Sequence, residues 1–358
     1  MDQKLRIVCN ITATTKSFSA AFYYLSTSYN QLPAKYRIEY VLQVIQAGYY
    51  PILAVVGVPV NVLTMIILCR KMCGLSNCIT RYLLAMAAAD LLVVIIDLIL
   101  RHIPIVYLEQ FTFIKSVPLC NIHAVLLYAA TDCSVWYTVA FTFDRFMAIC
   151  CQNLKIKFCT KKTATMILTT VTVLSCSKNI TWYFILTGWY RLWNEPWFCE
   201  VTDNVQFSHF WGSIEFLHYI LTPGIPFVLI LLLNALTIRH IVVTNRARKR
   251  LHVHNVGARN KDVEMDSRRK SIILLFFISA NFILLWAVLM VYSTWDRLWE
   301  LGYRVLFLDY FVMELGFMLQ LLSCSTNTCI YVMTQAKFRN QFKQFLRYPF
   351  TAILQLIE

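Results

Sequence analysis

The sequence has little charge: Asp, Glu, Lys and Arg make up 15% of its 358 residues, whereas 58% of the residues are hydrophobic. This balance excludes a disordered chain, and it is far more apolar than that of an ordinary soluble domain. Glycine and proline are also scarce, with 9 of each, which excludes collagen-like and low-complexity sequences. A chain of this composition is expected to place most of its apolar side chains against lipid.

Three long stretches lack Asp, Glu, Lys and Arg altogether, namely Pro51 to Cys69, Phe216 to Ile238 and Ser271 to Trp295. Each is about as long as the ~20 residues that a helix needs to cross ~30 Å of hydrocarbon. Because the alternating pattern of a membrane barrel is absent, these runs predict helices. Further apolar stretches carry only isolated charges: Tyr82 to Leu100, Ile122 to Phe143, Thr163 to Tyr190 and Tyr310 to Met333.

The predicted fold class is an all-α membrane protein, a seven-transmembrane helix bundle with a short amphipathic C-terminal helix. The bundle forms one domain, 45–333, which follows an extracellular N-terminal segment, 1–44. An amphipathic helix and short cytoplasmic tail, 334–358, come after it. The spans are predicted near 45–70, 79–106, 117–150, 161–190, 211–243, 269–295 and 304–333.

The formal net charge of +14 could indicate a nucleic-acid partner, but Lys and Arg are concentrated in alternate links and in the tail. This is the positive-inside signal of a membrane protein, and it places the N-terminus outside the cell. Phe338, Phe342 and Phe345 share one helical face among basic residues, which predicts a helix on membrane lipids; a frayed basic tail is the alternative. We expect a multi-pass protein of the plasma membrane with no nucleic-acid partner.

The exterior segments carry signs of an oxidising compartment. Asn10 begins an Asn-Ile-Thr sequon and is the predicted glycosylation site. The sequon at Asn179 lies inside a predicted span and is expected to stay unmodified. Of the 13 cysteines, only Cys9, Cys120 and Cys199 are expected to meet oxidising conditions.

Several motifs appear in order along the predicted spans: Gly57-Val-Pro-Val-Asn61, Leu84-Ala-Met-Ala-Ala-Ala-Asp90, Asp144-Arg145-Phe146, Pro226, Trp286 and Asn327-Thr-Cys-Ile-Tyr331. Together they resemble the rhodopsin-like, or class A, G-protein-coupled receptors over nearly all of residues 45–347. The stretch from Tyr82 to Asp90, Leu285-Trp286-Ala287 and the spacing of Pro226 and Asn234 are also similar to the orphan receptor one-hundred-and-thirty-nine group, in which aromatic amino acids have been proposed as ligands.

The chain departs from the family pattern in several places. Val288 and Thr328 replace prolines, Phe146 replaces a tyrosine, and Asn234 stands where many receptors have a tyrosine. The fourth span also lacks the usual tryptophan at mid-depth. Losing the proline at Val288 removes one source of a helix kink, because a proline deletes a backbone hydrogen bond.

The resemblance implies a disulfide between Cys120 and Cys199. Such a bridge would tether the second exterior loop to the third span and stabilise the fold by ~2 to 4 kcal/mol. Two free exterior thiols are the alternative.

The resemblance also implies a polar network at mid-membrane around Asp90. A bare carboxylate is costly there, so a sodium ion or a proton is expected to neutralise it. Oxygen-bearing side chains suit a hard cation such as sodium; a protonated Asp90 without sodium is the alternative. The implied network is Asn61, Asp90, Ser134, Ser323 and Asn327.

The family's activation switch corresponds to two sets of residues. Asp144 is expected to hold Arg145 at rest and to release it towards a G protein on activation; an anchor to lipid phosphate is the alternative. Trp286, Asn327 and Tyr331 are expected to change position on activation, and the alternative for the two aromatic residues is ordinary core packing.

The ligand site is predicted among four charged or titratable side chains towards the outer ends of spans two and seven: Asp97, Arg101, His102 and Glu314. An ion pair between Asp97 and Arg101, at i and i+4, explains two of them equally well. The resemblance argues against a biogenic amine, because Leu127 stands where amine receptors have an aspartate. It excludes a covalently bound retinal, because Leu321 stands where opsins have a lysine.

Together these observations predict a receptor that binds an extracellular small molecule or peptide and promotes nucleotide exchange on a heterotrimeric G protein. The receptor is not expected to be an enzyme or to need a cofactor other than an allosteric sodium ion. A membrane transporter or channel is the alternative, but the chain shows no internal repeat.

Overall fold

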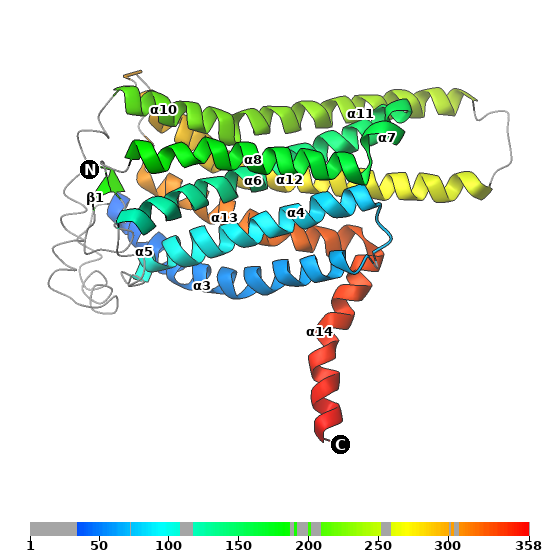
Figure 1. The fold of residues 1–358 in the computed structure, drawn as a ribbon, viewed down its shortest axis with the longest axis horizontal. Coiled ribbons are helices and arrows are strands. Elements are labelled where there is room, and N and C mark those ends of the chain that lie inside the picture. Colours follow the sequence, from blue (N-terminus) through cyan, green and yellow to red (C-terminus); the bar gives the residue numbers. More distant parts are fainter. Residues whose placement is uncertain are drawn as a thin grey trace.

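A computed structural model describes residues 34–71, 73–107, 117–186, 190–191, 200–201, 209–251, 259–300, 302–303 and 308–357. Long helices lie side by side in one bundle, with strand β1 (Tyr190–Arg191) at one end (Figure 1). Helix α14 (Ala336–Ile357) leaves the opposite end at a steep angle. We name these the β1 end and the α14 end. The predicted helical membrane bundle is confirmed.

The first helices of the bundle are α3 (Ala34–Cys69), α4 (Asn77–Val93) with its continuations η2 (Val94–His102) and α5 (Ile103–Tyr107), α6 (Val117–Cys150), α7 (Gln152–Phe158) and α8 (Lys161–Leu186). The later ones are α10 (His209–Tyr219), η4 (Ile220–Gly224), α11 (Ile225–Leu251), α12 (Arg259–Glu300) and α13 (Tyr310–Thr334).

Six helical segments are long and apolar enough to cross a membrane: Arg37–Cys69, Asn77–Tyr107, Leu119–Cys150, Phe216–Arg246, Arg269–Trp299 and Tyr310–Thr334. The predicted fourth span, α8, is not one of the six, because threonines, serines and Lys178 make its sequence more polar. It nevertheless packs along α6 and α4 within the bundle (Figure 1).

Several predicted boundaries move. Helix α3 begins at Ala34 rather than near residue 45, because no Gly or Pro interrupts the chain between Pro33 and Gly48. Helix α8 ends at Leu186, and Tyr190 lies instead in β1, which pairs antiparallel with β2 (Glu200–Val201). The short sheet is therefore an exception to the all-helical prediction. Helices α11 and α12 extend beyond the predicted spans, 211–243 and 269–295, into the basic stretch between them, α11 to Leu251 and α12 from Arg259.

Helices α12 and α13 approach each other closely at Gly316. A Cβ atom added to Gly316 would lie 2.9 Å from the Leu289 Cα atom, so this approach requires a glycine. Helix α12 runs as one helix through Val288, where the family has a proline. The largest apolar cluster includes Tyr82, Phe141 and Phe338, the last of which lies in α14.

Candidate functional site

The π-helical segment η2 brings two basic side chains to one carboxylate. In a π-helix the hydrogen bonds run from i to i+5, so residues four and five positions after Asp97 both lie close to it. Arg101 Nη1 lies 3.1 Å and His102 Nε2 lies 3.4 Å from the same atom, Asp97 Oδ1. The Asp97–Arg101 ion pair, one of the two explanations that the sequence left open, is therefore present.

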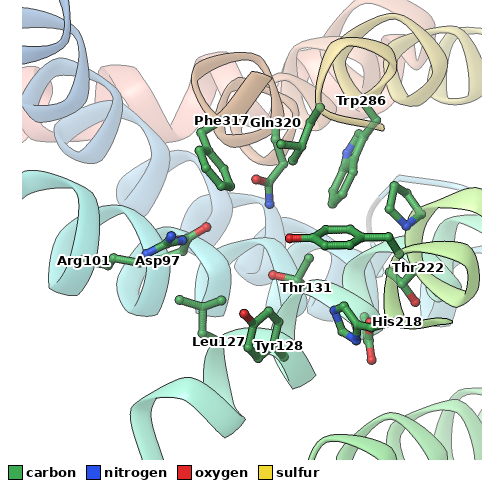
Figure 2. A pocket seen from close by; sticks show the side chains of 14 residues that line it. Asp97, Arg101, Leu127, Tyr128, Thr131, His218, Thr222, Trp286, Phe317 and Gln320 are labelled. Carbon is green, nitrogen blue, oxygen red and sulfur yellow. The ribbon is translucent and has the colours of Figure 1, made fainter. Parts of the chain in front are cut away.

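A cavity of about 90 Å³ lies between η2, α6, α10, η4, α12 and α13. Figure 2 shows Asp97 and Arg101 on one side of it and His218 on the other, with Trp286 and Gln320 along its wall. The cavity is small beside the ~300 to 1,000 Å³ of common drug-sized sites. Its lining is Asp97, Arg101, Leu127, Tyr128, Thr131, Asp132, His218, Tyr219, Thr222, Pro223, Trp286, Leu289, Phe317 and Gln320.

Two buried acceptor atoms of lining residues have no hydrogen-bond partner in the part of the chain that the structure describes. They are Asp132 Oδ1 and Gln320 Oε1. Leaving a buried acceptor unpaired costs about 1 to 3 kcal/mol, so such atoms call for an explanation. A ligand that donates hydrogen bonds would supply the missing partners.

The four predicted ligand residues are not all at the cavity. Asp97 and Arg101 line it, whereas His102 and Glu314 do not. The His102 ring packs behind the lining, with ring centroids 5.2 Å from Tyr50 and 5.1 Å from Phe317. Glu314 Oε2 accepts a hydrogen bond of 2.7 Å from Gln46 Nε2 of α3.

The buried Asp90 carboxylate joins α4, α6 and α13. Ser134 Oγ donates to Asp90 Oδ1 at 2.6 Å, and Asn327 Nδ2 donates to Oδ2 at 2.8 Å. The other two members of the predicted network bond elsewhere. Asn61 Nδ2 donates to the backbone oxygens of Gly57 and Cys324, and Ser323 Oγ donates to the Gln320 oxygen.

Trp286 lines the cavity and is also hydrogen-bonded to a polar residue of the neighbouring helix α13. Its Nε1 donates to Ser323 Oγ at 3.2 Å. Farther along the same two helices, Thr326 Oγ1 donates to Asn281 Oδ1 at 2.9 Å, and Asn281 lies 3.5 Å from Asn327. A continuous polar seam between α12 and α13 therefore leads from the cavity towards Asp90.

Asp144 and Arg145 are buried near the α14 end and form an ion pair, with Arg145 Nε 3.0 Å from Asp144 Oδ2. Two thiols contact the same aspartate. Cys78 Sγ donates to Asp144 Oδ1 at 3.1 Å, and Cys159 Sγ lies 3.7 Å from its backbone oxygen. Burial raises the pKa of Cys159 to about 11, so this thiol remains a protonated donor at neutral pH.

Tyr331 is buried against α14. Its ring centroid lies 5.8 Å from that of Phe338, and its hydroxyl oxygen has no hydrogen-bond partner among the described side chains and backbone. Nearby, Thr328, which replaces the expected proline, shares a 2.7 Å hydrogen bond with Thr64 of α3.

The order of these features along the chain agrees with a comparison against protein families. A family model described as 7 transmembrane receptor (rhodopsin family) matches residues 60–331. The chain belongs to this family. The protein is therefore a multi-pass membrane receptor of the class A G-protein-coupled type, and members of this family are receptors rather than enzymes. Their general partners are a G protein and an extracellular ligand.

Some predicted features of the receptor lie outside the described residues. Asn10 and Cys199 are among them, so glycosylation and the Cys120–Cys199 pairing stay predictions. Cys120 itself is disulfide-bonded. Similarity to the orphan receptor one-hundred-and-thirty-nine group also stays a prediction.

Sequence reasoning did not assign several residues that line the receptor's cavity, among them Thr131, Asp132, His218 and Gln320. One usable signal was present for Asp132. It is an intramembrane acid and Lys178 is the one basic residue in the middle of the next predicted span, and such charges are expected to pair. Asn179 is fully buried beside them, consistent with an unmodified sequon.

Proposed function

We propose that this receptor binds a small extracellular ligand in the cavity at the β1 end and, when bound, promotes nucleotide exchange on a heterotrimeric G protein at the α14 end. It would act in the plasma membrane with its N-terminus outside and α14 against the lipids of the inner leaflet. The observation that carries the proposal is Trp286, which lines the cavity and also starts the polar seam towards Asp90.

The charges around the cavity favour a ligand without net charge. Asp97 is paired with Arg101, and Asp132 is paired with Lys178. Since each acid is compensated, a ligand with a single net charge would lack a free counter-charge. The unpartnered oxygens of Asp132 and Gln320 favour a molecule with N–H or O–H donors. Tyr128 and Phe317 offer aromatic surface for the rest of the ligand.

The coupling follows from differential affinity. A ligand shifts the receptor towards an active state only if it binds that state better than the resting one. In the resting arrangement Arg145 is buried and held by Asp144. Movement of Trp286 against α13 would disturb the seam at Ser323 and release Arg145 towards the G protein. Exposed residues of α7, such as Ile156, and the basic ends of α11 and α12 would form the rest of the docking surface.

We also propose that sodium binds at Asp90. The carboxylate is buried, and no Lys, Arg or His of the described segments forms an ion pair with it. The hydroxyl of Ser134 and the amide of Asn327 already contact it, and Ser323 lies one helical turn before Asn327. These oxygens suit a hard cation. The sodium ion would hold α4, α6 and α13 together in the resting state.

A G-protein activation panel in cells tests the proposal. The wild-type receptor and Arg145→Ala would be screened against amino acids and short peptides without net charge, together with cationic amines as a contrasting class. The proposal expects an uncharged or zwitterionic agonist whose signal disappears with Arg145→Ala. A panel in which only net cationic ligands act, or in which the signal persists in Arg145→Ala, would overturn it.

A further inference from the structure

The two oxygens of Asp132 are held differently. Oδ2 receives two donors from α8: Lys178 Nζ at 2.6 Å and Asn179 Nδ2 at 2.5 Å. Oδ1 has no hydrogen-bond partner among the residues that the structure describes. Asn179 is itself fixed, because its Nδ2 also donates to the Ser175 oxygen at 2.8 Å. Helix α8 therefore anchors one oxygen of a cavity residue and leaves the other unpaired.

The position of Lys178 is unusual for a lysine that serves only packing. Its side chain is 30% exposed, and it lies about two turns before the end of a helix that packs within a membrane protein. A lysine ammonium beside hydrocarbon is costly. Asn179 already donates a hydrogen bond from α8 to Asp132 of α6, so Lys178 is not needed to link the two helices. What Lys178 adds is a positive charge next to Asp132.

We propose that Lys178 and Asn179 are positioning residues that keep Asp132 as a carboxylate and fix its plane, so that Oδ1 stays available as an acceptor for the ligand. This inference rests on the proposed function of the cavity. Lys178 does not line the cavity and would act through Asp132.

The charge state decides what Asp132 offers. As a carboxylate it accepts hydrogen bonds only; as a protonated acid it also carries one O–H donor. Without a positive neighbour, a carboxylate in this low-dielectric setting would take up a proton. The proton would occupy the oxygen that the ligand needs or turn it into a donor. Lys178 thus determines the kind of ligand group that Asp132 can bind, although the two helices would still pack without it.

The test is infrared spectroscopy of the full-length receptor in lipid nanodiscs without ligand. The variants are Lys178→Met, Lys178→Arg, Asp132→Asn and the double variant Lys178→Met/Asp132→Asn. We expect Lys178→Met to gain carboxylic-acid C=O absorption beyond that of the wild type, and we expect Lys178→Arg and the double variant to show no such gain. If Lys178→Met gains no such absorption, or if Asp132→Asn removes a carboxylic-acid band that the wild type already shows, the inference is wrong.

Two controls separate charge from folding. Leu174→Met lies one turn away on the same helix at a site 63% exposed, and it should leave the spectrum and the thermal unfolding temperature unchanged. If Lys178→Met does not fold, Lys178→Gln takes its place, and the same band is expected. A purely structural lysine would lower the unfolding temperature without producing the band, which would overturn the inference.

The infrared result is independent of any ligand. The proposed ligand site fails separately if Asp132→Asn leaves the response to every active compound unchanged. If both proposals hold, Lys178→Met should raise the agonist concentration for half-maximal response by about tenfold, with Lys178→Arg close to wild type. In the Asp132→Asn background, Lys178→Met should add no further loss, because its effect passes through Asp132.

Discussion

The buried acids of the receptor differ in how completely their oxygens are bonded. In Asp90 and Asp144, near the middle and the α14 end of the bundle, both carboxylate oxygens accept a hydrogen bond from a described side chain. In Asp132, at the cavity, one oxygen accepts two donors and the other accepts none. Asp90 and Asp144 thus use both oxygens in hydrogen bonds to other side chains of the bundle. Asp132 keeps one acceptor oxygen, Oδ1, without a donor among the described residues.

This difference in hydrogen bonding distinguishes acids that stabilise one arrangement of the helices from an acid that can still accept a hydrogen bond from a ligand. A buried acceptor with its donors in place stabilises the arrangement that supplies them, and loses that stabilisation when the helices move. A buried acceptor without a donor costs free energy until something binds it. The carboxylate of the proposed switch residue Asp144 therefore differs in its hydrogen bonding from that of Asp132 in the proposed ligand site.

The largest expected effect concerns the switch. Arg145→Ala should reduce ligand-stimulated nucleotide exchange to background, because in the proposed mechanism Asp144 releases this guanidinium towards the G protein. The measurement is nucleotide exchange on purified G protein with matched receptor levels. Lys162→Ala, an exposed basic residue at the same end, is the control and should keep nearly full activity. Full exchange with Arg145→Ala would show that Asp144 and Arg145 are only structural.

The next effect tests the unused acceptor. Asp132→Asn should raise the half-maximal agonist concentration by about 10- to 100-fold, since hydrogen bonds to charged groups contribute about 1.5 to 3 kcal/mol. Dose–response curves in cells provide the measurement. Asp296→Asn makes the same chemical change outside the cavity lining and should change potency less than threefold, roughly 0.6 kcal/mol. Equal shifts in both variants would contradict a specific role for Asp132.

A smaller effect is expected from sodium. Replacing choline chloride by sodium chloride at constant ionic strength should weaken agonist binding by about fivefold, the low end of common allosteric couplings. The dependence should vanish in Asp90→Asn. A wild-type receptor that binds agonist equally in both salts would instead favour the protonated Asp90.

The smallest effect concerns the Cys78 thiol, which donates a hydrogen bond to Asp144 Oδ1. Cys78→Ala should raise ligand-free nucleotide exchange by about two- to fivefold, because a thiol is a weak donor and its hydrogen bond to Asp144 is expected to contribute about 0.5 to 1 kcal/mol. Cys78→Ser keeps a donor and should stay near the wild-type level. Cys69→Ala replaces an exposed cysteine and serves as the control. A rise in Cys78→Ser as large as in Cys78→Ala would assign the effect to packing.

Much of the fold followed from the sequence because helical spacing carries it. Charge-free runs predicted membrane helices, and the resemblance to the receptor family placed Asp90, Ser134 and Asn327 in one network, where the structure brings them into contact. The boundaries were less certain. Helix α3 begins before the apolar run because no Gly or Pro interrupts the residues that precede it. Tyr190, which was predicted in the fourth span, instead pairs with Val201 in the short sheet.

The ligand candidates show the limit of such reasoning. His102 and Arg101 are neighbours in the sequence, yet only Arg101 lines the cavity, because consecutive residues of a helix point in different directions. The ring of His102 packs against Tyr50 and Phe317 instead. Glu314 sits at a plausible depth in α13, but Gln46 of α3 binds its carboxylate instead. The spacing of residues along a helix predicts which face of the helix a residue occupies. Whether that residue lines a cavity depends also on the direction of its side chain and on its neighbours in other helices.

The amino-acid sequence alone determined that hydrophobic helices span a membrane and that an Asp-Arg pair lies at one end of them. Those properties depend on the order and spacing of residues along one helix at a time. Only the tertiary structure decided for which of the acids Asp90, Asp132 and Asp144 both carboxylate oxygens receive a hydrogen bond and for which one oxygen receives none. That outcome depends on distances of a few ångströms between side chains of different helices, such as Lys178 and Asp132.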